Sequence, residues 1–258
     1  MRFVILGAGA VGGTIGGRLA DAGYDVLLLA RGEHAEVMRR DGLRLATPQR
    51  VIHVDVPVFD RPGDLPLRDG DVLLLTTKTQ QTAALLDGLP RRHLPIICAQ
   101  NGVTNERIAL RRFPNVYAMV VMLPAVHLEP GRVDAQGTPY SGLLDLGRYW
   151  HGIDDVTGAV ADALSASGFV SQSVERIMRW KYAKLLRNLG NALEALCGHD
   201  LDEDELKLVM ELDARAKDEA ISIYRAEGID WASDEEWMQR RQKQVEWAPV
   251  EGRNRGGG

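Results

Sequence analysis

The first twelve residues constrain this chain more than any other stretch. A short apolar run, Phe3 to Leu6, leads directly into Gly7-Ala8-Gly9-Ala10-Val11-Gly12, and an amphipathic helical pattern follows. A G-x-G-x-x-G motif between a strand and a helix is typical of dinucleotide-binding folds. The first glycine permits the tight turn, the second lets the backbone approach a pyrophosphate, and the third lets the helix pack on the strand. The motif predicts that these six residues bind a cofactor at the helix N-terminus; a glycine-rich turn without a ligand is the alternative.

The first half of the chain alternates strand-like and helix-like segments. The strand-like runs are continuous in Val, Ile and Leu, as expected of strands buried on both faces. They cover residues 3–6, 25–30, 71–76 and 94–99, with helical stretches at 11–22, 34–40, 79–86 and 104–111 and a short β excursion at 42–58. This alternation predicts a parallel sheet covered by helices.

The second half changes character twice. Short alternating runs in 115–147 predict hairpin-like strands that finish the sheet, followed by a helix at 153–167 and an edge strand at 168–170. From about Val174 the strand signals stop, and the period is helical in three segments, 175–197, 203–227 and 232–247. The middle helix has an apolar stripe, formed by Leu206, Met210, Ala214, Ile221 and Tyr224, with Asp202 or Asp204 as its cap and Gly228 at its end.

These patterns predict an α/β protein with two domains. A Rossmann-type dinucleotide-binding domain spans residues 1–173, and an all-α domain spans residues 174–258. We expect the helical domain to contribute to substrate binding and to form the interface of any homodimer.

Composition excludes several classes of protein. The 258 residues hold 31 Lys and Arg against 36 Asp and Glu, a net charge of −5 without a basic block, which argues against a nucleic-acid partner. No run approaches the roughly 20 apolar residues of a membrane span, and the N-terminus does not have the pattern of a signal peptide. The two cysteines, Cys98 and Cys197, form no disulfide framework, the six histidines form no metal-ligand cluster, and no G-x-S-x-G elbow occurs. We expect a cytoplasmic protein without a metal, a membrane or a nucleic acid as partner.

The second predicted strand ends in Ala30-Arg31. A site that prefers NAD carries Asp or Glu at about this position, where the carboxylate bonds the ribose 2′-hydroxyl. Here the carboxylate is absent, and Arg31 supplies a guanidinium that can pair with a 2′-phosphate. The sequence therefore favours NADP(H) over NAD(H); the alternative is that Arg31 is a solvated loop residue.

Two polar segments follow later strands of the first domain. Lys78 comes shortly after the strand at 71–76, and Asn101 after the strand at 94–99. Ligands of open α/β sheets bind beyond the carboxyl ends of strands. Both residues are therefore expected on the rim where the ribose and nicotinamide would lie, although Asn101-Gly102 is also an ordinary turn pair.

The helix predicted at 175–197 has an unusual polar face. Lys184, Asn188 and Asn191 stand at i, i+4 and i+7, which places one amine and two amides on one side. Such groups suit a carboxylate and a carbonyl oxygen, and a lysine in a partly dry cleft can act as a general acid. A solvated polar stripe is the alternative. Lys181, three residues before Lys184, is the rival amine, but it lies to one side of the two asparagines.

Five short features together resemble the ketopantoate reductase (2-dehydropantoate 2-reductase) family. They are the glycine motif, Ala30-Arg31, Lys78 with Gln81, Cys98-Ala99-Gln100-Asn101-Gly102-Val103, and Trp180 followed by Lys184-Leu185-Leu186-Arg187-Asn188. The resemblance covers nearly the whole chain in the family's order. It implies that Lys184 is the catalytic lysine, that Asn101 contacts cofactor and substrate, that Asn188 contacts the substrate, and that Lys78 contacts the cofactor.

Two positions depart from the family pattern. The second helix asparagine of the family falls where this chain has Ala192, one residue after Asn191, which we keep as a candidate for substrate binding. The family also continues into helices that carry a Glu near an Asp-Tyr-x-Asn-Gly stretch, and no such stretch precedes Gly258. We therefore expect the helical domain to be incomplete at its C-terminus, either because the chain is a fragment or because part of the site has been lost.

The expected function is that of an oxidoreductase. It is the NADPH-dependent reduction of a small 2-oxo acid, 2-dehydropantoate or a similar compound, to the 2-hydroxy acid, as in pantothenate biosynthesis. The alternative is a non-catalytic NADP-binding redox sensor or partner protein that has lost its catalytic C-terminal part.

Overall fold

The main sheet formed by the described residues has seven strands. The computed structural model describes residues 1–90, 92–198, 201–242 and 244–250. The strands lie in the order β12–β8–β7–β6–β1–β2–β5, all parallel to their neighbours except β12, which is antiparallel to β8. Their bounds are β1 Arg2–Leu6, β2 Asp25–Leu29, β5 Val58–Phe59, β6 Asp71–Leu75, β7 Ile96–Cys98, β8 Val116–Met119 and β12 Leu146–Arg148. The predicted parallel sheet is confirmed.

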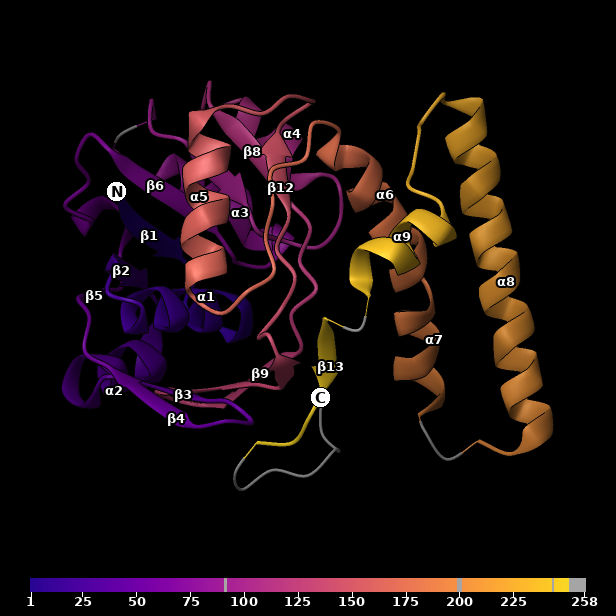
Figure 1. The fold of residues 1–258 in the computed structure, drawn as a ribbon, viewed down its shortest axis with the longest axis horizontal. Helices are drawn as coiled ribbons and strands as arrows, with labels where there is room; N and C mark the ends of the chain where they lie inside the picture. The colour runs from indigo at the N-terminus through magenta and orange to yellow at the C-terminus, as the bar shows by residue number, and fades with distance from the viewer. Residues whose placement is uncertain (91, 199–200, 243, 251–258) are drawn as a thin grey trace.

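Helices cover both faces of this sheet (Figure 1). Alternate residues of β1 reach two separate cores: Phe3 and Ile5 pack with α1 and α5, whereas Val4 and Leu6 pack with α3 and α4. This burial on both sides explains the continuous apolar runs. The helices of this part are α1 Ala10–Asp21, α2 Gly32–Asp41, α3 Thr79–Asp87, α4 Asn105–Leu110 and α5 Asp155–Ala166, with a 3-10 turn η1 at Pro62–Asp64. The first four predicted strands and helices end within two residues of their observed ends.

A second sheet of four strands lies on the other side of α1. Its order is β4–β3–β10–β9, with bounds β3 Leu43–Ala46, β4 Val51–Val54, β9 Ala125–Glu129 and β10 Arg132–Ala135. The prediction that all of 115–147 finishes one sheet is therefore wrong for β9 and β10, because β10 pairs in parallel with β3 instead. The predicted edge strand at 168–170 is only an isolated bridge between Val170 and Leu143.

Glycines allow α1 to lie between the two sheets. A Cβ on Gly16 would lie 2.8 Å from Leu28 of the main sheet, and a Cβ on Gly13 would lie 2.8 Å from Val133 of the second sheet. Any side chain at these two positions would push one sheet away from the helix. The close packing of α1 thus fixes the second sheet over the carboxyl ends of β1 and β2.

The C-terminal part consists mainly of helices. Their bounds are α6 Ile177–Asn188, α7 Gly190–Cys197, α8 Glu203–Ala226 and α9 Asp234–Arg241. Asp202 caps α8 through a capping box, and Gly228, with φ +63°, follows its end, as predicted. The predicted helix at 232–247 is too long: α9 ends at Arg241, and β13 (Val245–Trp247) pairs with β11 (Gly137–Pro139) of the first part. The α/β fold class is confirmed, with this short strand inside the helical region.

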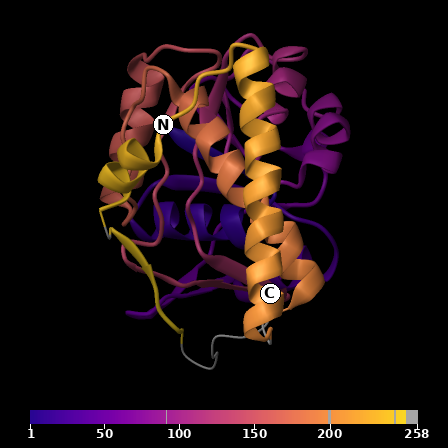
Figure 2. The same ribbon diagram turned by 90° about the vertical axis from the view of Figure 1, so that its right-hand side faces the viewer.

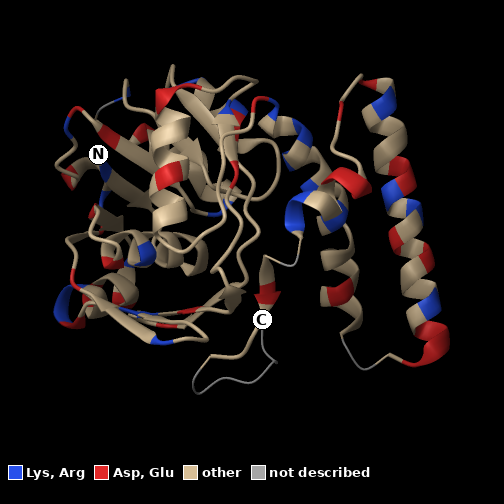
Figure 3. Ribbon diagram, viewed as in Figure 1, with Lys and Arg blue, Asp and Glu red and all other residues tan. Residues whose placement is uncertain are grey.

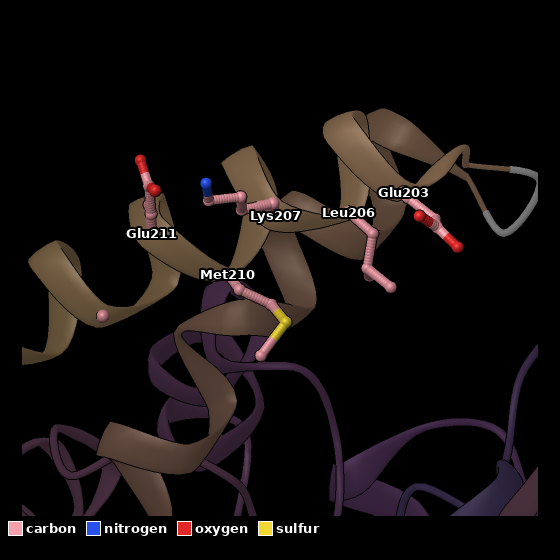
Figure 4. Close-up of a pocket in the computed structure, with 6 residues that line it drawn as sticks. Glu203, Leu206, Lys207, Met210 and Glu211 are labelled. Atoms are coloured by element: carbon pink, nitrogen blue, oxygen red, sulfur yellow. The ribbon is translucent and has the colours of Figure 1, made fainter.

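The helix α8 lies on the outer side of α6 and α7 (Figures 1 and 2), and both signs of charge occur along it (Figure 3). Of its predicted apolar stripe, Tyr224 is buried, but Leu206 and Met210 are 50% and 64% exposed and line a shallow pocket (Figure 4). Among the described residues, no helix is long and apolar enough to cross a bilayer.

Candidate active site

A cleft of about 670 Å³ opens at the carboxyl ends of β1, β2, β6 and β7. This is the edge at which open α/β sheets bind their ligands. The second sheet forms the opposite wall through Val126 and His127 of β9. Of the predicted cofactor-binding residues, the cleft is lined by Gly7, Ala8, Gly9, Ala10, Val11, Arg31, Lys78 and Asn101. Gly12 does not line the cleft, because it lies at the contact between helix and strand.

The glycine loop has the shape that a pyrophosphate needs. Gly7 has φ +117°, and a Cβ there would lie 2.6 Å from the methyl group of Thr77. A Cβ on Gly12 would lie 2.1 Å from the carbonyl oxygen of Gly7, whereas Gly9 faces open space. The helix α1 has no side-chain cap and no acidic residue in its first turn. Its first amides can therefore donate to an anion at the positive end of the helix dipole, and a dinucleotide fits this loop.

Arg31 also lines this cleft. It follows β2 and is the exposed N-cap residue of α2. Its guanidinium forms no hydrogen bond or ion pair within the part of the chain that the structure describes. Because no carboxylate competes for it, Arg31 can bind an anionic group of a ligand.

Lys78 and Asn101 reach the cleft from two neighbouring strands. Lys78 is the exposed N-cap residue of α3, after β6, and Asn101 is exposed after β7. The hydroxyl of Thr76 donates to the carbonyl oxygen of Gly7 at 2.8 Å, which ties the end of β6 to the glycine loop. The two loops and the glycine motif therefore form one rim.

Lys184 lies on α6, close to α9, and does not line this cleft. Burial lowers the pKa of Lys184, and the positive charges of Arg241 and Arg187 lower it further. Within the described ranges its amine has no carboxylate or hydrogen-bonding partner. A desolvated lysine without a counter-charge releases its proton nearer to neutral pH, as a general acid requires.

The two asparagines of the predicted polar face lie in different surroundings. Asn188 is the last residue of α6 and is partly buried. Asn191 is exposed on α7 and lines a groove between α7 and α8, together with Leu193 and Met210. The structure therefore groups Asn191 with the outer helices and not with the cofactor cleft.

Lys181 has a role that the sequence analysis missed. Its side chain is only 2% exposed, and its Nζ lies 2.5 Å from Oε1 of the fully buried Glu106. The same amine donates to the carbonyl oxygen of Gln100 at 2.9 Å. From the sequence, Lys181 is only a rival proton donor, and Glu106 is not a candidate. No local signal could have revealed the pair, because the partner belongs to another element, α4.

His34 joins the glycine loop to the second sheet. The amide of Gly131, in the turn between β9 and β10, donates to Nδ1 of His34 at 2.8 Å, so the proton of the neutral ring is on Nε2, which donates to the carbonyl oxygen of Ala8 at 2.8 Å. The ring also stacks on His127 with centroids 4.0 Å apart. Burial lowers the pKa of His34, and His127 adds to this effect, while the bond to Ala8 opposes it.

This geometry predicts an acid-sensitive contact. The lowered pKa means that neutral His34 contributes stability above pH about 6.5, and that this stability is lost as the pH falls through the folded-state pKa. Protonated His34 cannot accept the Gly131 bond, whose loss costs about 1 kcal/mol. Urea unfolding at pH 7.5 and 5.5 should therefore show a smaller decrease for His34→Gln than for the natural protein. His53→Gln, on the exposed edge of β4, is the control; equal decreases in all three proteins would contradict the prediction.

The chain is similar to proteins of one family. Residues 3–149 match the family model described as ketopantoate reductase PanE/ApbA. A 2-dehydropantoate 2-reductase from Pyrococcus horikoshii is 30% identical over 213 residues, which cover 80% of this chain and 68% of the relative. Across four curated relatives, the chain spans 61% to 77% of their length.

Two solved structures extend the similarity into the helical region. The PanE/ApbA family ketopantoate reductase from Ralstonia eutropha JMP134 matches with a TM-score of 0.78 at 26% identity, over 94% of this chain and 80% of that chain. A D-mandelate dehydrogenase in a ternary structure with NADH and anilino(oxo)acetate matches with a TM-score of 0.79 at 25% identity, over 94% and 79%. Because the family model covers more than half of the residues, and these relatives agree over most of the rest, the chain belongs to the ketopantoate reductase PanE/ApbA family.

Proposed function

We propose that this protein reduces a small 2-oxo acid, 2-dehydropantoate or a close analogue, to the 2-hydroxy acid with NADPH. The observation that carries the proposal is the cleft itself, which is lined both by a glycine loop that suits a pyrophosphate and by Arg31, a residue without an ion-pair partner among the described residues. The names of the relatives support the substrate class, since they are 2-dehydropantoate 2-reductases and a D-mandelate dehydrogenase, which acts on a related 2-hydroxy acid.

The residues of the cleft support one orientation of the cofactor. The amides at the start of α1 would hold the pyrophosphate, and Arg31 would pair with the 2′-phosphate. Lys78 and Asn101 would then lie beside the ribose and the nicotinamide, beyond β6 and β7. When bound, the dihydronicotinamide supplies the hydride that the reaction needs.

The helical region would supply the proton. As hydride reaches the carbonyl carbon of the substrate, the oxygen becomes an alkoxide, and the Nζ of Lys184 would donate a proton to it. The hydroxyl of the product then carries the proton, and the neutral amine is reprotonated from water. Asn101 and Asn188 would orient the substrate through its carbonyl and carboxylate oxygens. A substrate contact of Asn191 stays a prediction.

The test is NADPH oxidation, followed at 340 nm, with ketopantoate and a panel of 2-oxo acids that differ in their side chains. We expect turnover with at least one branched 2-oxo acid, and a lower rate with NADH. Tight NADPH binding without turnover by the complete protein would overturn the proposal and favour a non-catalytic NADP-binding protein.

A further inference from the structure

The buried pair of Lys181 and Glu106 joins the two parts of the molecule. Lys181 belongs to α6 of the helical region, and Glu106 belongs to α4 of the Rossmann-type part. The side chains are 2% and 0% exposed, and their charged atoms lie 2.5 Å apart. The third group in this contact is the carbonyl oxygen of Gln100, which accepts a bond from Lys181 at 2.9 Å. A helix of one part thus bonds directly to a strand-end loop of the other.

That loop is held by a buried polar network. The amide of Gln100 donates to the carbonyl oxygen of Thr77 at 2.6 Å and to the hydroxyl of Thr82 at 3.0 Å. Thr82 in turn donates to the side chain of Asn105 at 3.0 Å, and Asn105 donates to Thr79 at 3.1 Å. Thr82 and Asn105 are fully buried. These hydrogen bonds therefore hold together the two loops that carry Lys78 and Asn101.

The positions of these contacts along the chain matter for the proposed reaction. Gln100 directly precedes Asn101, which would lie beside the nicotinamide. Lys181 precedes Lys184 by three residues, almost one turn of the same helix. The bond from Lys181 to Gln100 therefore links two segments. One is the loop of Asn101, beside the proposed nicotinamide position, and the other is the turn of α6 that precedes Lys184, the proposed proton donor.

We propose that Lys181 and Glu106 are positioning residues, which fix the distance between Lys184 and the Asn101 loop. This inference rests on the proposed function. Lys181 is already bound to a carboxylate and a carbonyl oxygen, and its role is to hold α6 in place against the rim of the cleft. Glu106 compensates the charge of Lys181, so that the amine can donate to Gln100 inside the protein.

If the Lys181–Glu106 pair only stabilised the fold, an apolar pair that preserves stability should also preserve kcat. Replacing a buried ion pair by apolar residues of similar size is often neutral or stabilising, whereas removing one partner alone leaves a buried charge and is strongly destabilising. An apolar pair would therefore keep the two parts packed, but it would remove the directed bond to the carbonyl oxygen of Gln100. In the double variant, stability should therefore be nearly unchanged while kcat falls.

The experiment compares Lys181→Met/Glu106→Leu with the natural protein, with Lys181→Met alone, and with Lys217→Met. The last variant breaks a more exposed lysine pair, with Asp213 on α8, and serves as the control. We expect the double variant to keep its Tm within about 5 °C, while Lys181→Met alone loses more. The affinity of the double variant for NADPH should stay within a few-fold of that of the natural protein. Its kcat should fall about tenfold, because the reacting groups are misplaced.

A second readout is independent of turnover. Hydrogen exchange of the amides in 100–106 should be faster in the double variant than in the control, in protein without ligand. Unchanged exchange and unchanged kcat in the double variant would overturn the inference. If the natural protein reduces no 2-oxo acid, the proposed function fails, and the exchange measurement still decides whether the pair fixes the loop. A loss of kcat as large as that of Lys184→Ala would instead make Lys181 the proton donor.

Discussion

Lys184→Ala should lower kcat by about 100-fold or more, the typical contribution of a general acid, while NADPH binding changes little. The reason is that the amine of Lys184 is desolvated, has a lowered pKa and has no counter-charge in the described part of the chain, whereas Lys181 is bound to Glu106 and Gln100. Steady-state kinetics and NADPH fluorescence titration measure the two quantities separately.

The dependence of kcat on pH gives a second test of Lys184 as the general acid. A general acid must be protonated, so kcat should fall as the pH rises through the pKa of Lys184, which lies below the usual value of 10.5. In Lys184→Ala, this decrease of kcat at high pH should be absent. Lys181→Ala is the control: it should lose more stability, because Glu106 is left unpaired, but less kcat. The reverse order of the two kcat losses would assign the proton donor to Lys181 and would remove the argument for Asn188 as well.

Arg31→Ala should weaken NADPH binding by about 1.5–3 kcal/mol, the range of a charge-assisted hydrogen bond, or about 10- to 150-fold in Kd. The affinity for NADH should stay almost unchanged, since NADH has no 2′-phosphate. The side chain of Arg31 lines the cleft, and no acid group in the described ranges pairs with it. Fluorescence titration with both cofactors measures the difference.

The matched control for this prediction is Arg40→Ala. Arg40 lies at the other end of α2, is exposed, and pairs with Asp41. Its removal should leave both affinities unchanged. Equal losses of NADPH and NADH affinity in Arg31→Ala would show that Arg31 supports the fold of the loop and does not select the cofactor.

The dinucleotide cleft could be predicted from sequence because its signals are local. The strand, the glycine turn and the helix of residues 2–21 follow each other without interruption, and the structure shows a steric reason for glycine at Gly7 and Gly12, while Gly9 faces open space. Arg31, Lys78 and Asn101 each follow the carboxyl end of a parallel strand. They therefore lie at the same end of the sheet, as the topology of such sheets requires.

The second sheet could not be predicted, because alternation identifies a strand but not its partner. The runs that form β9 and β10 show the same alternation as those of β8 and β12, yet β10 pairs with the distant β3, and β9 pairs with β10. Similarly, β13 was predicted as helix, but it pairs with β11, a partner more than 100 residues earlier in the chain. The apolar stripe of α8 predicted burial, but Leu206 and Met210 remain exposed, since α8 lies on the outer side of the helical region.

The two lysines of α6 show the same limit of prediction from sequence. Helical spacing places Lys181 and Lys184 on neighbouring faces of one helix, and both are compatible with catalysis. Only the fold shows that Glu106 and Gln100 surround the first, while Arg187 and Arg241 lie near the second. The identity of a buried partner depends on tertiary packing, which periodicity does not encode.

The most direct test of the central claim follows the hydride itself. The protein is incubated with NADPH deuterated at C4, each of the two stereoisomers in turn, and with ketopantoate, and the product is analysed by mass spectrometry and proton NMR. Our account predicts that deuterium from one of the two isomers appears at C2 of the 2-hydroxy acid. NADPH that binds but transfers deuterium from neither isomer to any 2-oxo acid of the panel would contradict it.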